Sequence, residues 1–172
     1  MRPRPAPVIV LLGAAVAAGI YGYSTWSVHR VQPVTPAAPI PADAQAAVLG
    51  ISAIYTIDYQ EPASAWLSRV CSVSTQAGCQ FTSGYVAAMV QLDAQKYQIQ
   101  TGCSVTPVEA VDTLADGARV WKLQVHLDHP WPGAAEAQDV YALVTRDENG
   151  PWKFERLLFS QESAQYEEVS AK

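Results

Sequence analysis

The longest stretch without a charged residue, residues 8–28, constrains this chain more than any other feature of its sequence. Its 21 positions read VIVLLGAAVAAGIYGYSTWSV. A helix rises about 1.5 Å per residue, so a run of this length spans a hydrocarbon core roughly 30 Å thick. We therefore interpret residues 8–28 as a transmembrane anchor and residues 1–7 as a cytoplasmic stub.

The charges on either side of this run predict its orientation. Arg2 and Arg4 precede it, whereas Arg30 alone follows it closely. An excess of positive charge stays in the cytoplasm, so the N-terminus is expected inside and the rest of the chain outside. Aromatic rings suited to the outer interface are Tyr21, Tyr23 and Trp26.

A cleaved signal peptide is the alternative, because residues 15–17 fit a small-x-small cleavage pattern. The apolar run continues for about ten residues beyond that point, which favours a retained anchor. Both interpretations place the remaining chain outside the cytoplasm.

The three cysteines, Cys71, Cys79 and Cys103, all follow the apolar run. An oxidising compartment favours disulfides, and three cysteines allow three pairs. Cys71 and Cys79 flank a short polar stretch and are the predicted pair, with a stabilisation of about 2.6 kcal/mol. Cys103 lies in a strand pattern and is expected to be a buried free thiol. The spacing of zinc ligands is absent, so neither a metal nor another cofactor is predicted.

Composition limits the partners of the exported part. Beyond Arg30 the chain has 8 Lys/Arg and 16 Asp/Glu, a net charge of −8, which disfavours direct binding of nucleic acid. Residues 29–42 include four prolines and are expected to form a semi-rigid spacer of up to about 30 Å. Residues 43–160 are the length of one ordinary domain.

Apolar periodicity predicts three helices in the first half of this domain. They cover residues 43–59 with Asp43 as N-cap, residues 63–70, and residues 82–92 with Thr82 as the cap. In the second and third helices, the side chains expected to face inward are Trp66, Leu67, Val70, Tyr85, Val86, Met89 and Val90.

Strand patterns fill the second half. Strands are expected at residues 96–111, 119–128, 138–146 and 152–159, with turns at 116–117 and 149–150. Gly102 and Pro107 predict a bend or bulge in the first strand, where Tyr97, Ile99, Cys103 and Val105 share one face.

The strand at 119–128 alternates strictly between two faces. One face carries Trp121, Leu123, Val125 and Leu127; the other carries Lys122, Gln124, His126 and Asp128. Residues 161–172 are expected to be a flexible acidic tail. Helices followed by antiparallel strands predict an α+β fold, with helices packed on a curved sheet.

Two segments carry a family resemblance. AVLGISAIYTIDYQEPASAWL resembles the opening helices of nuclear transport factor 2-like (cystatin-like) domains, and RDENGPWKFERLLF resembles their closing hairpin. The resemblance implies a cone-shaped pocket between helix and sheet, in which some relatives are isomerases or dehydratases. Residues that would line it here are Tyr55, Asp58, Tyr59 and Tyr97. Tyrosines packed at the rim and an exposed Asp58 are the stronger interpretation, so no catalytic residue is assigned.

A single anchor joined to such a domain also resembles the VirB-type and TcpC-type scaffold proteins of conjugation and type IV secretion machines. That resemblance implies a non-catalytic scaffold that binds other membrane-complex subunits, with self-association as a further option. The alternatives are an exported accessory domain that binds a small apolar ligand or lipid for a transport system, and an enzyme.

Two features of the loop after the alternating strand complete the candidates. His126, Asp128 and His129 are interpreted as a solvated turn in preference to a metal site. Trp131 lies between two prolines, where a rigid aromatic side chain anchors a partner or closes as a lid over the core. The sequence leaves both roles for Trp131 open.

Overall fold

The computed structural model describes residues 39–146 and 150–167, and within them the α+β prediction is confirmed. Helical elements come first, and a last helix closes the domain. The helical elements are α2 (Ala42–Tyr55), α3 (Ala63–Val73), α4 (Gln76–Phe81), the π-helix η1 (Thr82–Val86), α5 (Ala87–Tyr97) and α6 (Ser160–Glu167). The strands are β1 (Ile57–Asp58), β2 (Gln100–Thr101), β3 (Cys103–Thr113), β4 (Arg119–Leu127), β5 (Ala137–Thr145) and β6 (Lys153–Leu157).

Four of the strands form an antiparallel meander in the order β3-β4-β5-β6, while β1 and β2 make a separate antiparallel pair. The predicted alternation of β4 is confirmed, because its four apolar residues are buried on the face that packs against α2. The opposite face carries a smaller apolar cluster of Val120, Tyr141 and Leu158, which Tyr166 of α6 helps to cover.

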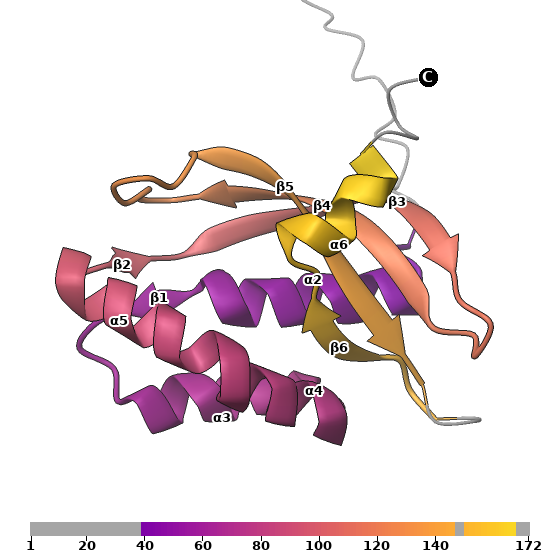
Figure 1. Cartoon of the computed structure of the whole chain (residues 1–172), viewed down its shortest axis with the longest axis horizontal. Helices are drawn as coiled ribbons and strands as arrows, with labels where there is room; N and C mark the ends of the chain where they lie inside the picture. The colour runs from indigo at the N-terminus through magenta and orange to yellow at the C-terminus, as the bar shows by residue number, and fades with distance from the viewer. Residues whose placement is uncertain (1–38, 147–149, 168–172) are drawn as a thin grey trace, which may run out of the picture. The chain divides into compact units, whose positions relative to one another are not determined.

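Helix α2 lies between the sheet and the layer of α3, α4 and α5, as Figure 1 shows. A helix that is covered on both sides needs apolar or small residues around most of its circumference, which is what α2 has. Its buried residues are Asp43, Ala44, Ala46, Ala47, Gly50, Ile51, Ala53 and Ile54.

Gly50 sets how closely the sheet approaches this helix. A Cβ atom added at Gly50 would lie 2.0 Å from Cγ of Phe154 in β6, so the aromatic ring occupies the space of the missing side chain. Phe154 is fully buried. Side chains therefore fill the space between α2 and the sheet at this point, where the family resemblance implies a pocket.

The N-cap predicted for α2 is wrong. The helix begins at Ala42, and Pro41 precedes it without a side-chain cap. Asp43 points into the protein instead, where its carboxylate accepts hydrogen bonds from Arg119 at 2.7 Å and from Trp121 at 3.0 Å. The local sequence is typical of an N-cap, but the Asp43 carboxylate is bonded to β4 residues that are distant in sequence and is not available to cap the helix.

The same helix also ends four residues earlier than predicted. Thr56 adopts an extended conformation, and Ile57 and Asp58 then pair with Thr101 and Gln100. A short strand thus replaces the last turn of the expected helix. Because β2 follows α5 and lies about 40 residues further along the chain, a local sequence pattern could not predict this pairing.

The third predicted helix is longer and starts earlier. Thr75 caps α4 by accepting a hydrogen bond from the Gly78 N–H, and the helical run continues through η1 to Tyr97. Thr82 is therefore a buried residue within the run, not a cap. The run ends at Gln98, whose φ of 50° is left-handed, so Tyr97 belongs to a helix and the following strand begins at Gln100.

The C-terminal tail is another correction, since residues 160–167 form α6. Arg156 holds Glu162 in an ion pair at 2.7 Å, and the Tyr166 ring stacks on Tyr141. These tertiary contacts order the helix, and a polar, acidic segment gives no local signal that predicts them.

Several predictions fall outside the described residues, namely the stub, the anchor at 8–28, most of the spacer, the first residue of the 149–150 turn and residues 168–172. Of the helices the structure does describe, none combines the length and apolar character that crossing a membrane requires. The turn at 116–117 is confirmed, as is the irregularity next to Pro107, where the β3–β4 register shifts.

The predicted disulfide is confirmed. Cys71 at the end of α3 and Cys79 in α4 are bonded, with their Cα atoms 4.7 Å apart. Cys103 is a half-buried free thiol whose sulfur lies 3.9 Å from the Ser52 carbonyl oxygen. Burial raises the pKa of the Cys103 thiol, and the Asp128 carboxylate adds to that shift while Thr56 opposes it.

Candidate functional site

An apolar stripe lies exposed along η1 and α5. Tyr85 is 67% exposed, Met89 51% and Leu92 69%. Their spacing of four and then three residues places them on one side of a helix. The side chains come from a continuous helical run in the layer farthest from the sheet (Figure 1).

The opposite side of the same run packs into the domain. Val86 and Ala94 are buried, and Val90 lies against both of their clusters. The expectation that Tyr85 and Met89 face inward is therefore wrong, while Val86 and Val90 do so. The sequence signal that was missed is that this helix has apolar residues on two faces. Packing against the domain buries only one face, so the second face is left exposed.

Exposed apolar residues need no explanation when scattered singly, but a contiguous stripe marks a contact surface. Among its neighbours in sequence, Ser83, Gln91 and Gln95 are polar and uncharged, whereas the charged Asp93 and Lys96 lie near its end. We refer to Tyr85, Met89 and Leu92 as the α5 stripe.

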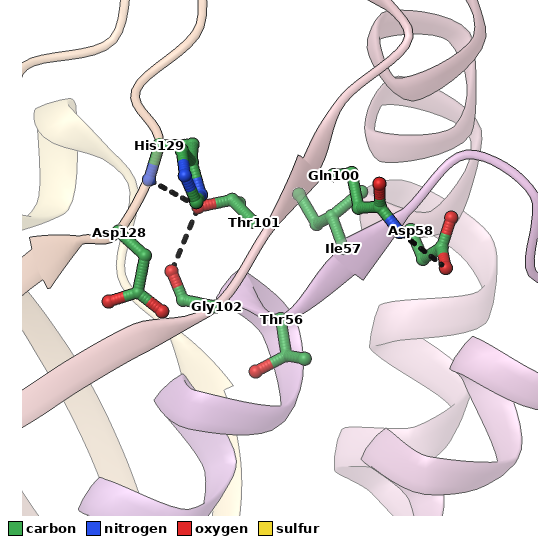
Figure 2. Close-up of a pocket in the computed structure, with 8 residues that line it drawn as sticks. All are labelled: Thr56, Ile57, Asp58, Gln100, Thr101, Gly102, Asp128 and His129. Atoms are coloured by element: carbon green, nitrogen blue, oxygen red, sulfur yellow. Dashed lines mark hydrogen bonds between the residues drawn. The ribbon is translucent and has the colours of Figure 1, made fainter.

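A separate open pocket of about 490 Å³ lies where β1, β2 and the end of β4 meet. Figure 2 shows Asp128 and His129 on one side of it and Asp58 with Gln100 on the other. Gly102 forms part of the lining, and a Cβ atom there would lie 2.5 Å from an Asp128 carboxylate oxygen. The absence of a side chain at Gly102 thus makes room for Asp128.

Hydrogen bonds within this pocket organise its own loops. Asp58 accepts from the Gln60 N–H at 2.9 Å, and the His129 N–H donates to Thr101 Oγ1 at 3.0 Å (Figure 2 draws the latter). Gln100 Nε2 also lies 3.4 Å from the Asp58 carboxylate, and Thr101 Oγ1 donates to the Gly102 carbonyl at 2.9 Å. This arrangement suits the binding of a polar or cationic group.

The four residues expected to share a cone-shaped pocket are distributed over different surroundings. Asp58 lines the open pocket, whereas Tyr55 lines a smaller one beside β5. Tyr59 packs beside Ile57 and Ile99, and Tyr97 lies at the end of α5 with the Lys96 ammonium 4.6 Å from its ring centre.

The two histidines near the end of β4 have different partners. His126 Nε2 lies 3.7 Å from Glu136, while the backbone of His129 bonds to Thr101. Over residues 39–146 and 150–167, no group of three or more His, Cys, Asp or Glu side chains has the geometry of a metal site.

Trp131 is half-buried and packs against both inward clusters of the helical side. Its carbonyl accepts a hydrogen bond from the Ala134 N–H at 2.9 Å, which closes a turn after Trp131. Of the two roles left open by the sequence, this placement favours the lid.

Comparison with known proteins gives one structural match. No family model and no curated protein matches the chain. A solved structure described as a periplasmic fragment of TraM matches at 13% identity and a TM-score of 0.41, covering 67% of this chain and 93% of that one. At an identity this low, the function of this chain is inferred from its own residues.

Proposed function

We propose that this chain is a membrane-tethered, non-catalytic interaction domain that works outside the cytoplasm. The α5 stripe is the observation that carries the proposal, because an exposed apolar helix face of this length is a ready surface for a second helix. The partner we propose is an apolar helix in another subunit of a membrane complex.

Two further features support the location. The Cys71–Cys79 disulfide is of the kind that persists in oxidising compartments. The charge-free run at residues 8–28 has the length of a membrane anchor. A tethered domain meets its partner at a high effective concentration, so a modest contact surface is sufficient.

The absence of catalysis is also part of the proposal. In the parts of the chain that the structure describes, the carboxylates of the open pocket face solvent or cap turns. Candidate acids and bases gain catalytic strength from burial and paired charges, which this pocket does not supply.

We further propose that the complex is a conjugation-type or secretion-type apparatus, on the basis of the anchor-plus-domain architecture. A nuclear transport factor 2-like relationship belongs to the same proposal. It is supported by a long helix packed across an antiparallel sheet and by the resemblance of the two quoted segments.

Co-purification from membranes tests the contact surface. Detergent-solubilised complexes should lose other subunits by about tenfold or more when Leu92→Ser is introduced, since the loss of a large apolar anchor weakens binding by about 1.4 kcal/mol or more. Val108→Ser, at another exposed apolar position on β3, is the matched control.

The melting temperature of both variants should stay close to that of the unchanged protein, because both side chains are exposed. Subunit recovery that is equal for Leu92→Ser and Val108→Ser would contradict the assignment of the α5 stripe as the contact surface.

An exported ligand-binding accessory domain remains the second candidate, and the open pocket favours it. Its volume of about 490 Å³ lies in the range of small-molecule sites. A thermal-shift screen with small amines and lipids would detect such a ligand, and Asp128→Asn should abolish the shift without loss of the α5 stripe contact.

A further inference from the structure

Strand β5 is paired on only one side over its first half. Its pairing with β6 begins at Ala142, opposite Leu157, and ends at Thr145. Residues 137–140 pair with β4 alone. In Figure 1 the β4–β5 hairpin extends beyond the end of β6.

The hydrogen-bond pattern shows which backbone groups face this open side. The Tyr141 carbonyl accepts from the Leu158 N–H on the β6 side, while the Glu136 carbonyl accepts from Leu127 in β4. Backbone groups alternate sides along a strand. The N–H and C=O groups of Ala137 and Asp139 therefore face away from β4, where the described chain places no strand.

The outer strands of the sheet are protected in ways that this segment is not. Beside β6, the Thr75 N–H donates to the Phe154 carbonyl, and Ser74 forms a bridge to the same residue. The free edge of β3 contains Pro107 and two register shifts, which discourage pairing with another strand.

A pocket of about 220 Å³ lies at the open segment, between β5 and α6, which lines it from Ser160 to Glu167. Its apolar lining includes Tyr55, Leu157 and Phe159. Tyr141 lines it too, and the Tyr141 hydroxyl is buried without a hydrogen-bond partner among the described residues.

The charge of the lining selects the kind of ligand. The residues that line the pocket include the acidic Asp139 and Glu167 and no Lys or Arg. Lys122 pairs with Asp139 at 3.0 Å from the adjacent strand, which leaves the exposed Glu167 without a cation in the lining. A basic side chain complements this surface.

We propose that residues 137–140 bind an extended, positively charged segment of a partner protein, which adds to the sheet as a strand antiparallel to β5. Main-chain hydrogen bonds to Ala137 and Asp139 hold the segment, and its side chains enter the pocket. This contact goes beyond the proposed function, because it uses a surface separate from the α5 stripe.

Hydrogen exchange on the full-length protein in lipid nanodiscs tests the contact without any substitution. The probe is an eight-residue peptide of alternating valine and threonine with a lysine at each end. At saturation, we expect amide exchange of residues 137–141 to slow about fivefold or more. Unchanged exchange in this segment at saturating peptide would overturn the proposal.

Binding of a fluorescent form of the same peptide tests the backbone contact. Asp139→Pro removes an outward N–H and should weaken binding about tenfold or more. Asp139→Asn keeps the N–H and should stay within about threefold, because Lys122 already pairs with the Asp139 carboxylate and the unpaired charge of the lining belongs to Glu167. Equal affinity for the two variants would overturn the proposal. So would equal binding of a peptide that is N-methylated at alternate amides.

The test separates this contact from the proposed function. Leu92→Ser should leave peptide binding unchanged, because Leu92 lies on the α5 stripe and not at β5. Peptide binding therefore stands or fails independently of subunit recovery in the co-purification experiment.

Discussion

At the scale of single residues, Asp43 ties the start of α2 to β4. It is 3% exposed and accepts hydrogen bonds from both Arg119 and Trp121. Burial by itself opposes ionisation, but the bonds from Arg119, Trp121 and the backbone outweigh it and lower the pKa of the carboxyl below its usual value. The charged form is therefore the one that the fold stabilises.

We predict that Asp43→Asn lowers the free energy of unfolding at pH 7 by about 1–3 kcal/mol, because Arg119 and Trp121 lose a charged acceptor. Urea unfolding measures the difference. Asp93→Asn, on the exposed side of α5, should change it by less than about 0.5 kcal/mol.

The difference between Asp43→Asn and the unchanged protein should depend on pH. Since the folded pKa lies below the unfolded value, the stabilisation is present above the unfolded pKa of about 3.9 and is lost as the pH falls through the folded pKa. A difference that stays constant from pH 7 to below pH 3 would show that the charge of Asp43 does not contribute.

Gly50 supports a second prediction at this scale. Gly50→Ala places a Cβ atom against the Phe154 ring, so α2 and β6 must move apart, at a cost of about 1–3 kcal/mol. Gly84→Ala is the control, because a Cβ atom there would have no atom within 4 Å apart from its chain neighbours and its own helix backbone, and alanine favours helices by about 1 kcal/mol. Melting temperatures of the two variants should change in opposite directions.

At the scale of elements, the disulfide holds α3 against α4. Reduction of Cys71–Cys79 should lower the free energy of unfolding by about 2.6 kcal/mol in the loop-entropy estimate. Unfolding with and without a reductant measures this difference. Cys103→Ser should respond to the reductant as the unchanged protein does, and a Cys103-linked peptide in a non-reducing digest would contradict the pairing.

The loop after β4 gives the next prediction. Because Trp131 packs on two apolar clusters, Trp131→Ala should lower stability by about 1–3 kcal/mol, less than for a fully buried tryptophan. A melting curve decides between the two roles of Trp131. An unchanged melting temperature together with loss of co-purifying subunits would make Trp131 a partner anchor and not a lid.

At the scale of the whole molecule, we predict that the full-length chain remains in the membrane fraction after carbonate and high-salt washes. The reason is the charge-free run at residues 8–28 with its aromatic outer end. Soluble protein that begins near Ala18 would show that the run is a cleaved signal peptide.

Local signals in the sequence were sufficient for the α+β class, the β4 register and the Cys71–Cys79 pair. Each depends on neighbours within about ten residues, such as the strict alternation around Leu123 or the short loop between two cysteines. The exposed α5 stripe was missed because Tyr85 and Met89 match the same helical period as the buried residues beside them.

The sequence by itself therefore determined the apolar run, the alternating strands and the spacing of the cysteines, because these are properties of consecutive residues. Only the tertiary structure decided that Asp43 serves Arg119 and Trp121 in place of a helix cap, and that residues 57–58 leave the helix to pair with β2. The same is true of the second helix face and the open edge of β5. The physical reason is that burial and hydrogen-bond pairing depend on residues far apart in the chain, whose packing outweighs local preference.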